Sequence, residues 1–407
     1  MVVDFAVITA TGKDRPGLIA EITETIALAN VNIVDIEAFS MRGLFAIFMI
    51  VDCRAASIPA ERLKAQLREV GSDIGLEVTM DSYVSGRRKA LKKLVLLTTI
   101  GKDRPGIVAK VSEFLYRRNA NIERIRMVAQ GELNAMEILI DISDLPSRFE
   151  DFRRDLESAC SDVAQDVVLQ TENVFRRPKK LIVFDVDSTL INVEVINELA
   201  KAAGVGEKVK EITEKAMEGK ISFKQALKER ARLLKGLDIK VLEAIADNLE
   251  ITPGAEELVN TLKALGYKIA LISGGFTYFV NKIKARLGID YAYANKLVIT
   301  EGKLTGEVEE PIIDEKRKGE LIRRLAKEEN LLMEEVVSVG DGANDRLMLR
   351  NSGLGIALNP KEALRKIADG VLTKENLVGM LYCLGAPEER IREALSKIRE
   401  NRKPIKS

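Results

Sequence analysis

The sequence predicts a protein of the α/β class, in which a duplicated small module precedes a doubly wound parallel sheet that carries a helical insertion. Three observations predict this arrangement. A segment near the start of the chain recurs further on, short apolar runs alternate with helical stretches in the C-terminal half, and one long part of that half reads as helices alone. A length of 407 residues also favours several domains over a single core.

The N-terminal part contains an internal repeat. TGKDRPGLIAEI, which begins at Thr11, recurs as IGKDRPGIVAKV from Ile100, and NVNI at Asn30 recurs as NANI at Asn119. Both segments recur after the same shift of 89 positions (11 to 100 and 30 to 119). A constant shift over this distance indicates a duplicated domain.

Each copy has the same predicted order of elements: strand, GKDRPG loop, helix, two strands, helix and strand. The first strands are residues 5–9 and 94–98, and the third strands are residues 46–51 and 136–140. The first helix has apolar residues at helical spacing, namely Leu18, Ile19, Ile22 and Ile26. Asn32 and Asn121 are expected near the start of the second strand.

This plan resembles the ACT domain, a ferredoxin-like βαββαβ module that binds amino acids at paired interfaces. The resemblance implies two ACT-like domains at residues 1–88 and 89–176, and L-serine as an effector. Two interpretations stay open: ligand binding, or a loop that is only a turn, with Pro fixing the helix start, in a module used for homodimer assembly. Candidate effector-binding residues are Asp14, Gly17, Asn32, Asp103, Gly106 and Asn121.

The pattern changes after a short polar junction at residues 176–180. LIVFD from Leu181 is an apolar run of the kind found in parallel strands that are buried on both faces. Similar runs recur at residues 268–273, 336–341 and 355–358, with helical stretches such as 255–265 between them. We therefore predict a catalytic core at residues 177–192 and 251–387.

Residues 193–250 lack a strand pattern and read as successive helices, so we expect a helical cap inserted between the first two strands of the sheet. Ser222 followed by Gln225 fits a capping box within it. Residues 296–308 read as a hairpin around Glu301 and Gly302, either a flap over the site or an ordinary surface hairpin. The charged end, residues 388–407, is expected to be a helix that frays into a tail.

Two aspartates follow the first strand of the predicted core, in the segment FDVDST. Ligands of open α/β sheets bind at the carboxyl ends of the strands. Phosphoryl transfer needs a nucleophile, a proton donor for the leaving oxygen and neutralisation of charge. Asp185 can serve as the nucleophile, and Asp187 can act as general acid and then as base. Two aspartates in a turn or at a helix start are the structural alternative.

Three more groups follow later strands. Ser273 and Gly274 offer a hydroxyl and backbone N–H groups to a phosphoryl oxygen, although strand–Ser–Gly turns are common. The basic run of residues 316–318 could hold a phosphate or be a solvated face. In GDGAND, a carboxylate at a strand end suits Mg²⁺, with Asp341 as ligand and Asn344 and Asp345 in orienting roles.

These four motifs, in this order, resemble those of the phosphoserine phosphatases of the haloacid dehalogenase superfamily, whose core is a Rossmann-like sheet. The resemblance selects Lys318 from the basic run and implies that Ser273, Gly274 and Lys318 contact the phosphate. It further implies that Mg²⁺ is held by Asp185, Asp341 and the main-chain carbonyl of Asp187.

The resemblance also assigns the substrate pocket. It implies that Glu194 receives the ammonium group of phosphoserine and that Arg230 grips the carboxylate, which a guanidinium can do through two hydrogen bonds. Phe223 and Met217 would line the closed pocket. The structural alternatives are that Glu194 favours the first turn of a helix and that Arg230 is one more exposed charge.

Composition excludes several functions. The chain has no histidine, so a Ser-His-Asp triad and histidine metal ligands are excluded. A formal net charge of +1 gives no electrostatic basis for binding nucleic acid or a membrane surface. Its three cysteines are far apart in apolar stretches, as buried reduced thiols are, and without an apolar run long enough to span a bilayer we expect a cytoplasmic protein.

The sequence thus predicts a Mg²⁺-dependent phosphomonoesterase that, by resemblance, hydrolyses O-phospho-L-serine through a phospho-aspartate, the last step of serine biosynthesis. Two alternatives stay open. One is a related phosphatase or phosphotransferase acting on another small phosphomonoester. The other is a serine-sensing protein whose catalytic half is vestigial, against which the complete motif set argues.

Overall fold

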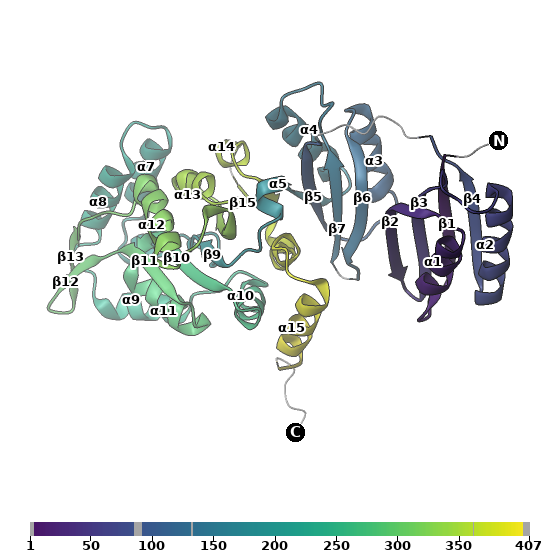
Figure 1. Cartoon of the computed structure of the whole chain (residues 1–407). Helices are drawn as coiled ribbons and strands as arrows, with labels where there is room; N and C mark the ends of the chain where they lie inside the picture. Colours follow the sequence, from purple (N-terminus) through teal and green to yellow (C-terminus); the bar gives the residue numbers. More distant parts are fainter. Residues whose placement is uncertain (1–3, 85–91, 132, 361, 402–407) are drawn as a thin grey trace. The chain divides into compact units, whose positions relative to one another are not determined.

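A computed structural model describes residues 4–84, 92–131, 133–360 and 362–401. The chain divides into two compact units, Met1–Leu91 and Lys92–Ser407, and each is described by itself. The first unit contains the first repeat copy, and the second unit contains the second copy together with the rest of the chain (Figure 1).

The first unit is a four-stranded antiparallel sheet of order β2-β3-β1-β4, with two helices. The apolar core lies between the sheet and the helices, and it includes Ile8 of β1, Ile22 of α1 and Leu63 of α2. The elements are β1 (Phe5–Lys13), α1 (Leu18–Leu28), β2 (Asn32–Met41), β3 (Leu44–Asp52), α2 (Ala60–Ile74) and β4 (Leu76–Ser82). The expected βαββαβ order is confirmed.

The second copy repeats this plan, with strand order β6-β7-β5-β8. Its core includes Leu97, Val111 and Phe152, all fully or almost fully buried. The elements are β5 (Leu94–Gly101), α3 (Ile107–Arg117), β6 (Asn121–Ala129), β7 (Asn134–Asp141), α4 (Phe149–Ser161) and β8 (Gln165–Thr171).

The core of the C-terminal half is a parallel sheet of order β11-β10-β9-β14-β15-β16. Its strands are β9 (Leu181–Phe184), β10 (Lys268–Phe276), β11 (Tyr291–Asn295), β14 (Val336–Gly340), β15 (Leu354–Leu358) and β16 (Gly370–Leu372). Strand β16 pairs antiparallel with β8, so the sheets of the second copy and the catalytic core form one ten-stranded sheet. No feature of the sequence predicts this pairing.

Helices cover both faces of the parallel sheet (Figure 1). Alternate residues of β9 face opposite layers: Ile182 and Phe184 join the core that includes α10 (Ala255–Ala264) and α11 (Thr277–Leu287), whereas Leu181 and Val183 join that of α12 (Glu315–Glu328) and α13 (Arg346–Asn351). This explains why β9 reads as a continuous apolar run.

The insertion is all-helical, as expected, and contains α6 (Val195–Ala202), α7 (Gly206–Met217), α8 (Phe223–Leu233) and α9 (Ile239–Asp247). The predicted hairpin is β12 (Leu297–Thr300) with β13 (Lys303–Val308). Two backbone hydrogen bonds connect the insertion to this hairpin. Gly236 N–H donates to the Leu304 carbonyl, and Ile239 N–H donates to the Gly302 carbonyl, both at 2.8 Å. That the hairpin acts as a flap stays a prediction.

The structure differs from the sequence-based expectations in three local details. Ile19 is 44% exposed, because the face of α1 that packs on the sheet contains Leu18, Ile22 and Ile26. The helix after GKDRPG starts at a glycine N-cap with φ near +98°, Gly17, and not at the preceding proline. The capping box at Ser222 is half formed: its hydroxyl accepts from Gln225 N–H, but the Gln225 side chain bonds Glu229.

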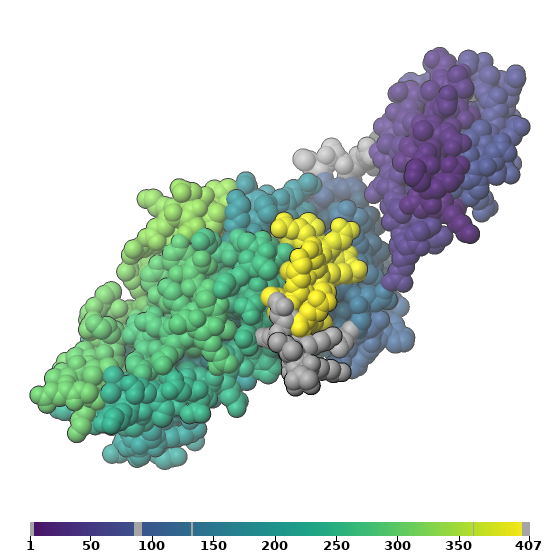
Figure 2. Space-filling view, turned by 90° about the horizontal axis from the view of Figure 1, so that it is seen from below, coloured from purple at the N-terminus to yellow at the C-terminus, as the bar shows by residue number. Residues whose placement is uncertain are grey.

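The charged C-terminal segment forms α15 (Glu388–Asn401), drawn in yellow in Figure 2. It packs on α10, and Arg399 bonds Glu257 of that helix at 2.8 Å between Nε and Oε1. The predicted tail at residues 402–407 lies outside the described residues. Among the helices that are described, none combines the length and the apolar character that a bilayer crossing requires.

Candidate active site

The site lies at the carboxyl end of β9, where the sheet order reverses. Strand β10 lies on one side of β9 and β14 on the other, so the loops after these three strands converge. Asp185 directly follows β9 and is 4% exposed; its N–H donates to the Val339 carbonyl at 2.8 Å. The register of the sheet therefore fixes the position of this carboxylate.

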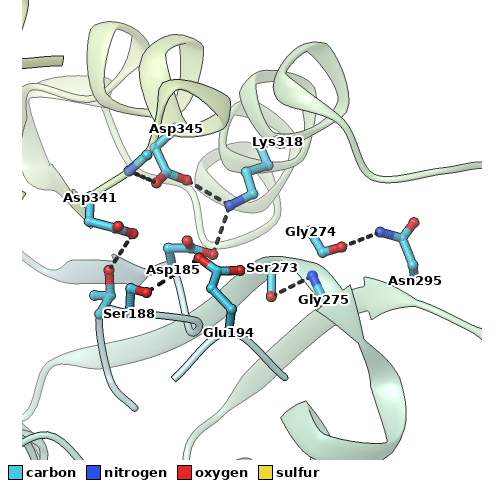
Figure 3. Close-up of polar contacts among 12 residues, drawn as sticks. Asp185, Ser188, Glu194, Ser273, Gly274, Gly275, Asn295, Lys318, Asp341 and Asp345 are labelled. Atoms are coloured by element: carbon cyan, nitrogen blue, oxygen red, sulfur yellow. Dashed lines mark hydrogen bonds and ion pairs between the residues drawn. The ribbon is translucent and has the colours of Figure 1, made fainter. Parts of the chain in front are cut away.

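Lys318 connects two aspartates from different loops. Its ammonium group is fully buried and donates to Asp185 Oδ1 at 2.7 Å and to Asp345 Oδ1 at 2.6 Å (Figure 3). Burial would lower the pKa of Lys318, but the two carboxylates outweigh this effect and raise it. Asp314 caps helix α12 one turn earlier by accepting from Arg317 N–H, while Lys316 of the same basic run is exposed.

Three carboxylates crowd together here. Oxygen atoms of Asp185, Asp341 and Asp345 all lie within 4.8 Å of one another. Asp345 uses both oxygens inside the protein, since Oδ1 accepts from Lys318 and Oδ2 from Gly342 N–H at 3.1 Å. Asp341 accepts only a long bond of 3.4 Å from the Thr189 hydroxyl among the contacts of the described chain. Asp345 therefore has an orienting geometry, and Asp341 has oxygen free for a ligand.

Burial is the main cause of the raised carboxyl pKa values in this cluster. It raises the pKa of Asp341 to about 7, with the charges of Asp345 and Glu194 adding to the effect. Burial and Asp345 also raise the pKa of Asp185, and Lys318 opposes them. Three carboxylates thus share one lysine, as expected of a site that holds a cation.

Asp187 lies two residues beyond Asp185 and points toward the end of β10. Its Oδ1 accepts from Val195 N–H at 3.4 Å, and its Oδ2 would be only 2.5 Å from a Cβ placed on Gly275. Burial, and then the charge of Glu194, raise the pKa of Asp187 to about 7. A carboxyl group in this state can both donate and accept a proton near neutral pH.

The end of β10, residues 273–275, is held by side chains of β10 and β11. Ser273 is fully buried, and its Oγ accepts from Gly275 N–H at 2.9 Å, which leaves the hydroxyl hydrogen available for a ligand. Asn295 at the end of β11 donates to the Gly274 carbonyl at 2.8 Å (Figure 3) and accepts from Ile313 N–H at 2.7 Å. Asn295 thus connects the end of β10 to the segment that leads into α12, the helix that contains Lys318.

The helical insertion places several predicted residues beside the site. Glu194 is the N-cap residue of α6, but its side chain does not cap the helix and instead accepts from Ser188 Oγ at 3.3 Å. Arg230 of α8 donates to Thr213 Oγ1 at 3.3 Å, and burial lowers its pKa while the charges of Glu194 and Asp187 oppose this.

Two apolar residues of the insertion differ in their placement. The Phe223 ring lies against the end of β10, with Cζ 3.0 Å from the position of a Cβ on Gly274. Met217 ends α7 and is 64% exposed, so it does not form a pocket wall in this structure. Asn344 also lies near the end of β10, with Nδ2 3.5 Å from that Gly274 position.

Sequence reasoning missed three residues that hold this site. The Thr189 hydroxyl contacts Asp341, and Asn295 bonds the Gly274 carbonyl at the end of β10. Ser188, whose backbone is left-handed (φ +59°), contacts Glu194. Thr189 belongs to the motif that was identified, so its hydroxyl could have been considered. Asn295 follows an apolar run that was not predicted as a strand, so no signal pointed to it.

The predicted effector residues occupy the GKDRPG loops and the strands after them. Asp103 and Gly106 line a cavity of about 450 Å³ in the second copy, where Asn134 Nδ2 donates to Asp103 Oδ1 at 3.1 Å. Asn121 bonds Glu123 and does not line that cavity. In the first copy Asp14 Oδ2 accepts from the Ser40 hydroxyl at 2.5 Å; Gly17 is the N-cap of α1, and Asn32 begins β2 and is exposed.

Family models match the two parts of the chain separately. Residues 179–353 match the haloacid dehalogenase-like hydrolases, and residues 4–81 and 93–170 each match the ACT domain. A phosphoserine phosphatase of Archaeoglobus fulgidus is 45% identical over 327 residues, which is 80% of this chain and 94% of that protein. The chain belongs to the phosphoserine phosphatase family.

Other members of the family have the same extent. A phosphoserine phosphatase of Streptomyces coelicolor is 35% identical over 392 residues, covering 94% of this chain and 92% of that protein. Among solved structures, a HAD family hydrolase from Salmonella enterica superposes with a TM-score of 0.63 at 28% identity, covering 71% of this chain and 98% of that one. The predicted fold class, including both ACT domains, is therefore confirmed.

Proposed function

We propose that this chain hydrolyses O-phospho-L-serine to L-serine and phosphate through a phospho-aspartate on Asp185, the last step of serine biosynthesis. The observation that carries the proposal is the buried triad in which the Lys318 ammonium group lies 2.7 Å from Asp185 and 2.6 Å from Asp345. Family membership at 45% identity over 80% of the chain supports the substrate.

The residues fit a divalent cation. The three clustered carboxylates offer hard oxygen ligands, and Lys318 is bonded to only two of them. Asp185 and Asp341, with the main-chain carbonyl of Asp187, would hold Mg²⁺, whereas the oxygens of Asp345 are already bonded within the protein. Bound Mg²⁺ would supply neutralisation of the negative charge on the transferring phosphoryl group.

The chain's own residues perform the two chemical steps. An oxygen of Asp185 attacks phosphorus as the bond from phosphorus to the serine oxygen breaks, and protonated Asp187 gives its proton to that oxygen. Water then attacks the phospho-aspartate, Asp187 takes a proton from it, and phosphate leaves as the Asp185 carboxylate is restored. Lys318 holds the nucleophile and stabilises the phosphoryl oxygens, with the Ser273 hydroxyl and Gly274 N–H donating to them.

Residues of the insertion would select the substrate. Glu194 would accept the ammonium group of phosphoserine, and Arg230 would bind its carboxylate with two hydrogen bonds. The charge of Glu194 acts on both Asp187 and Arg230, which supports the placement of these side chains around one ligand. Phe223, Met217 and Asn344 would complete the closed pocket, Met217 only after the exposed end of α7 moves.

The alternatives make different predictions. A phosphotransferase would use the same Asp185 chemistry but pass the phosphoryl group to an alcohol in place of water. A sensor with a vestigial catalytic half would not need an intact buried lysine between two aspartates, a costly arrangement for a fold to keep.

The test is phosphate release from L-phosphoserine with Mg²⁺, beside phosphothreonine and p-nitrophenyl phosphate, with EDTA as control. We expect metal-dependent release that is selective for phosphoserine, and loss of nearly all turnover in Asp185→Asn. Release from p-nitrophenyl phosphate alone would overturn the substrate. Release from none of the three would overturn the function.

Arg230 provides a sharper test of the substrate. Arg230→Ala removes a charge-assisted contact with the substrate carboxylate, so kcat/KM for phosphoserine should fall by about 10²-fold or more. p-Nitrophenyl phosphate lacks that carboxylate, so its kcat/KM should change little. Arg232→Ala on the same helix, where the side chain is exposed, is the matched control. Equal losses for both substrates would contradict the assigned role.

L-Serine is the effector that we propose for the ACT domains, at the loops that contain Asp14, Gly17, Asp103 and Gly106. The cavity beside Asp103 supports the second copy in particular, because Asn134 Oδ1 is buried there without a hydrogen-bond partner. Titration calorimetry of the full chain with L-serine should detect binding that Asp103→Asn weakens. Binding that this variant leaves unchanged would contradict the site. The cytoplasmic location, the homodimer, the domain boundaries and the roles of Asn32 and Asn121 stay predictions.

A further inference from the structure

The segment between β16 and α15 lies between the second ACT domain and the base of the helical insertion. We call residues 373–384 the connecting segment; it consists of η3 (Lys374–Cys383) with its two flanking residues. It contacts β5 of the ACT domain and α10 of the catalytic core. All of these elements belong to the second compact unit, Lys92–Ser407.

A single carboxylate oxygen of the ACT domain holds the start of this segment. Asp166 Oδ2, on β8, accepts from Thr373 N–H at 2.7 Å, from the Thr373 hydroxyl at 2.9 Å and from Asn376 Nδ2 at 2.8 Å. Three donors on one ionised oxygen make a strong local attachment. The preceding residue, Gln165, donates through Nε2 to the Lys102 carbonyl at 3.0 Å, so the GKDRPG loop is attached to the same point of β8.

The far end of the segment is held by close packing. A Cβ on Gly379 would lie 2.4 Å from Ile100 Cγ2, so only glycine lets the segment approach β5 this closely. Gln170 on β8 donates to the Cys383 carbonyl at 3.1 Å in a buried position. The segment therefore follows the ACT sheet at both ends.

The other side of the connecting segment faces the two ends of the insertion. We call these ends, residues 189–192 and 251–254, the hinge. Lys374 Nζ donates to Asn192 Oδ1 at 3.0 Å, and Val378 Cγ2 lies 3.0 Å from the position of a Cβ on Gly254. Asn192 and Thr252 flank the insertion, and the Thr252 hydroxyl lies 3.2 Å from Asn192 Oδ1 and 2.8 Å from the Thr189 carbonyl. An isolated bridge between Ile191 and Ile251 joins the two strands of chain there.

This hinge is directly connected to the catalytic cluster. The Thr189 hydroxyl donates to Asp341 Oδ1 at 3.4 Å, and Glu194 begins α6 only two residues after Asn192. A shift of the hinge would therefore move Glu194, which is proposed to bind the substrate, and Thr189, which orients the Asp341 carboxylate. Each contact from the GKDRPG loop to Asp341 is a hydrogen bond or a packed neighbour along the chain.

We propose that the connecting segment sets the position of the helical insertion, so that the second ACT domain, through Asp166 and Lys374, controls closure over the substrate. The inference rests on the proposed function for its kinetic readout. The repeat provides a comparison, since the shift of 89 positions places Glu77, exposed on β4, at the equivalent of Asp166. The first ACT domain lacks the glutamine as well, with Leu76 in its place.

The kinetic test uses Asp166→Asn and Lys374→Met in the full chain. Each should lower kcat/KM for phosphoserine by about 3- to 10-fold and that for p-nitrophenyl phosphate by less, because the latter lacks the groups that the insertion recognises. The double variant should lose no more than the stronger single variant, because both act through one segment. Lys374→Arg should restore activity, and Glu77→Gln should have no effect. Additive losses, or equal losses for both substrates, would overturn the proposal.

A distance measurement separates this proposal from the substrate assignment. All three cysteines are buried, so spin labels can be placed at Lys210→Cys on α7 and Lys327→Cys on α12, both exposed. Without substrate, Lys374→Met and Asp166→Asn should broaden and shift the distance distribution, and Glu77→Gln should leave it unchanged. Unchanged distances in all variants would refute control of the insertion. Changed distances in a protein that does not hydrolyse phosphoserine would uphold the coupling and refute the substrate.

Discussion

The Lys318 ammonium group is enclosed by protein and has two carboxylates as partners. Its burial would be strongly unfavourable without Asp185 and Asp345, and theirs without it. The same three groups that the proposed chemistry requires are therefore part of the stability of the core. Lys318, and not its neighbours Lys316 and Arg317, has this role because Asp314 is the N-cap of α12 and the fourth residue after it points inward.

Lys318→Met should both abolish turnover and destabilise the fold. The substitution leaves two buried carboxylates without their counter-ion, so we expect a loss of about 3 kcal/mol in the free energy of unfolding near neutral pH. Urea denaturation measures this change. Lys316→Met, on the exposed side of the same run, should stay within about 0.5 kcal/mol of the parent protein. Equal effects of the two substitutions would contradict the structural role of Lys318.

Gly275 is required by the close approach of Asp187. A Cβ there would lie 2.5 Å from Asp187 Oδ2 and 3.1 Å from Ser273 Oγ, so Gly275→Ala should displace the proton donor. We expect kcat to fall by about 10²-fold or more with a small change in the melting temperature. Gly206→Ala on α7, where a Cβ meets nothing within 4 Å, is the control. Full activity in Gly275→Ala would contradict this placement of Asp187.

Helix α8 illustrates how one element positions a specificity residue. Ser222 caps the helix through its hydroxyl, which accepts from Gln225 N–H at 3.2 Å, and Arg230 lies two turns further on. The buried residues Ala226, Leu227 and Ala231 lie within one turn of Arg230 on the same side of the helix, which packs inward. The direction of the Arg230 side chain thus depends on where the helix starts and on which face it buries.

Ser222→Ala should weaken this helix without affecting the core. Loss of an N-cap hydroxyl costs about 1 kcal/mol, so amide hydrogen exchange in α8 should become faster by about fivefold. Exchange in α10, whose N-cap is Gly254, should not change and is the internal control. Uniform acceleration across both helices would indicate a global loss of stability, and no change in α8 would contradict the cap's contribution.

At the scale of the molecule, the carboxylate cluster couples stability to pH and to metal. Without a cation, burial raises the pKa of Asp187 and Asp341 from 3.8 to about 7. Between these pH values the folded chain binds more protons than the unfolded chain. The free energy of unfolding therefore falls as the pH rises through this window, and the loss is complete above the folded-state pKa.

Mg²⁺ should reverse this loss. Its ligands must be ionised, so the gain in melting temperature on adding Mg²⁺ should be larger at about pH 8 than at about pH 5.5. At a concentration 100 times the dissociation constant, binding adds about 2.7 kcal/mol. Differential scanning calorimetry with EDTA as the reference measures the gain, and Asp341→Asn should remove most of it. An equal gain at both pH values would contradict binding at ionised carboxylates.

The sequence determined the parts whose signals are local. The constant shift of the repeat, the apolar runs and the motifs after them predicted two βαββαβ domains, a parallel core and an all-helical insertion. The burial of β9 between two apolar layers and the position of Asp185 follow from the same short segment. These features are encoded within a few residues, so they can be read without knowing what packs against them.

The tertiary structure alone decided what depends on pairing between distant segments. The antiparallel pairing of β8 with β16 uses backbone groups that any sequence offers. The residues of these two strands therefore do not predict one continuous sheet. Asn295 bonds the Gly274 carbonyl, and Lys374 bonds the Asn192 side chain. Neither Asn295 nor Lys374 stands out in the sequence. Their roles arise from which partners the fold brings within hydrogen-bond distance, because a polar side chain does not specify its partner in advance.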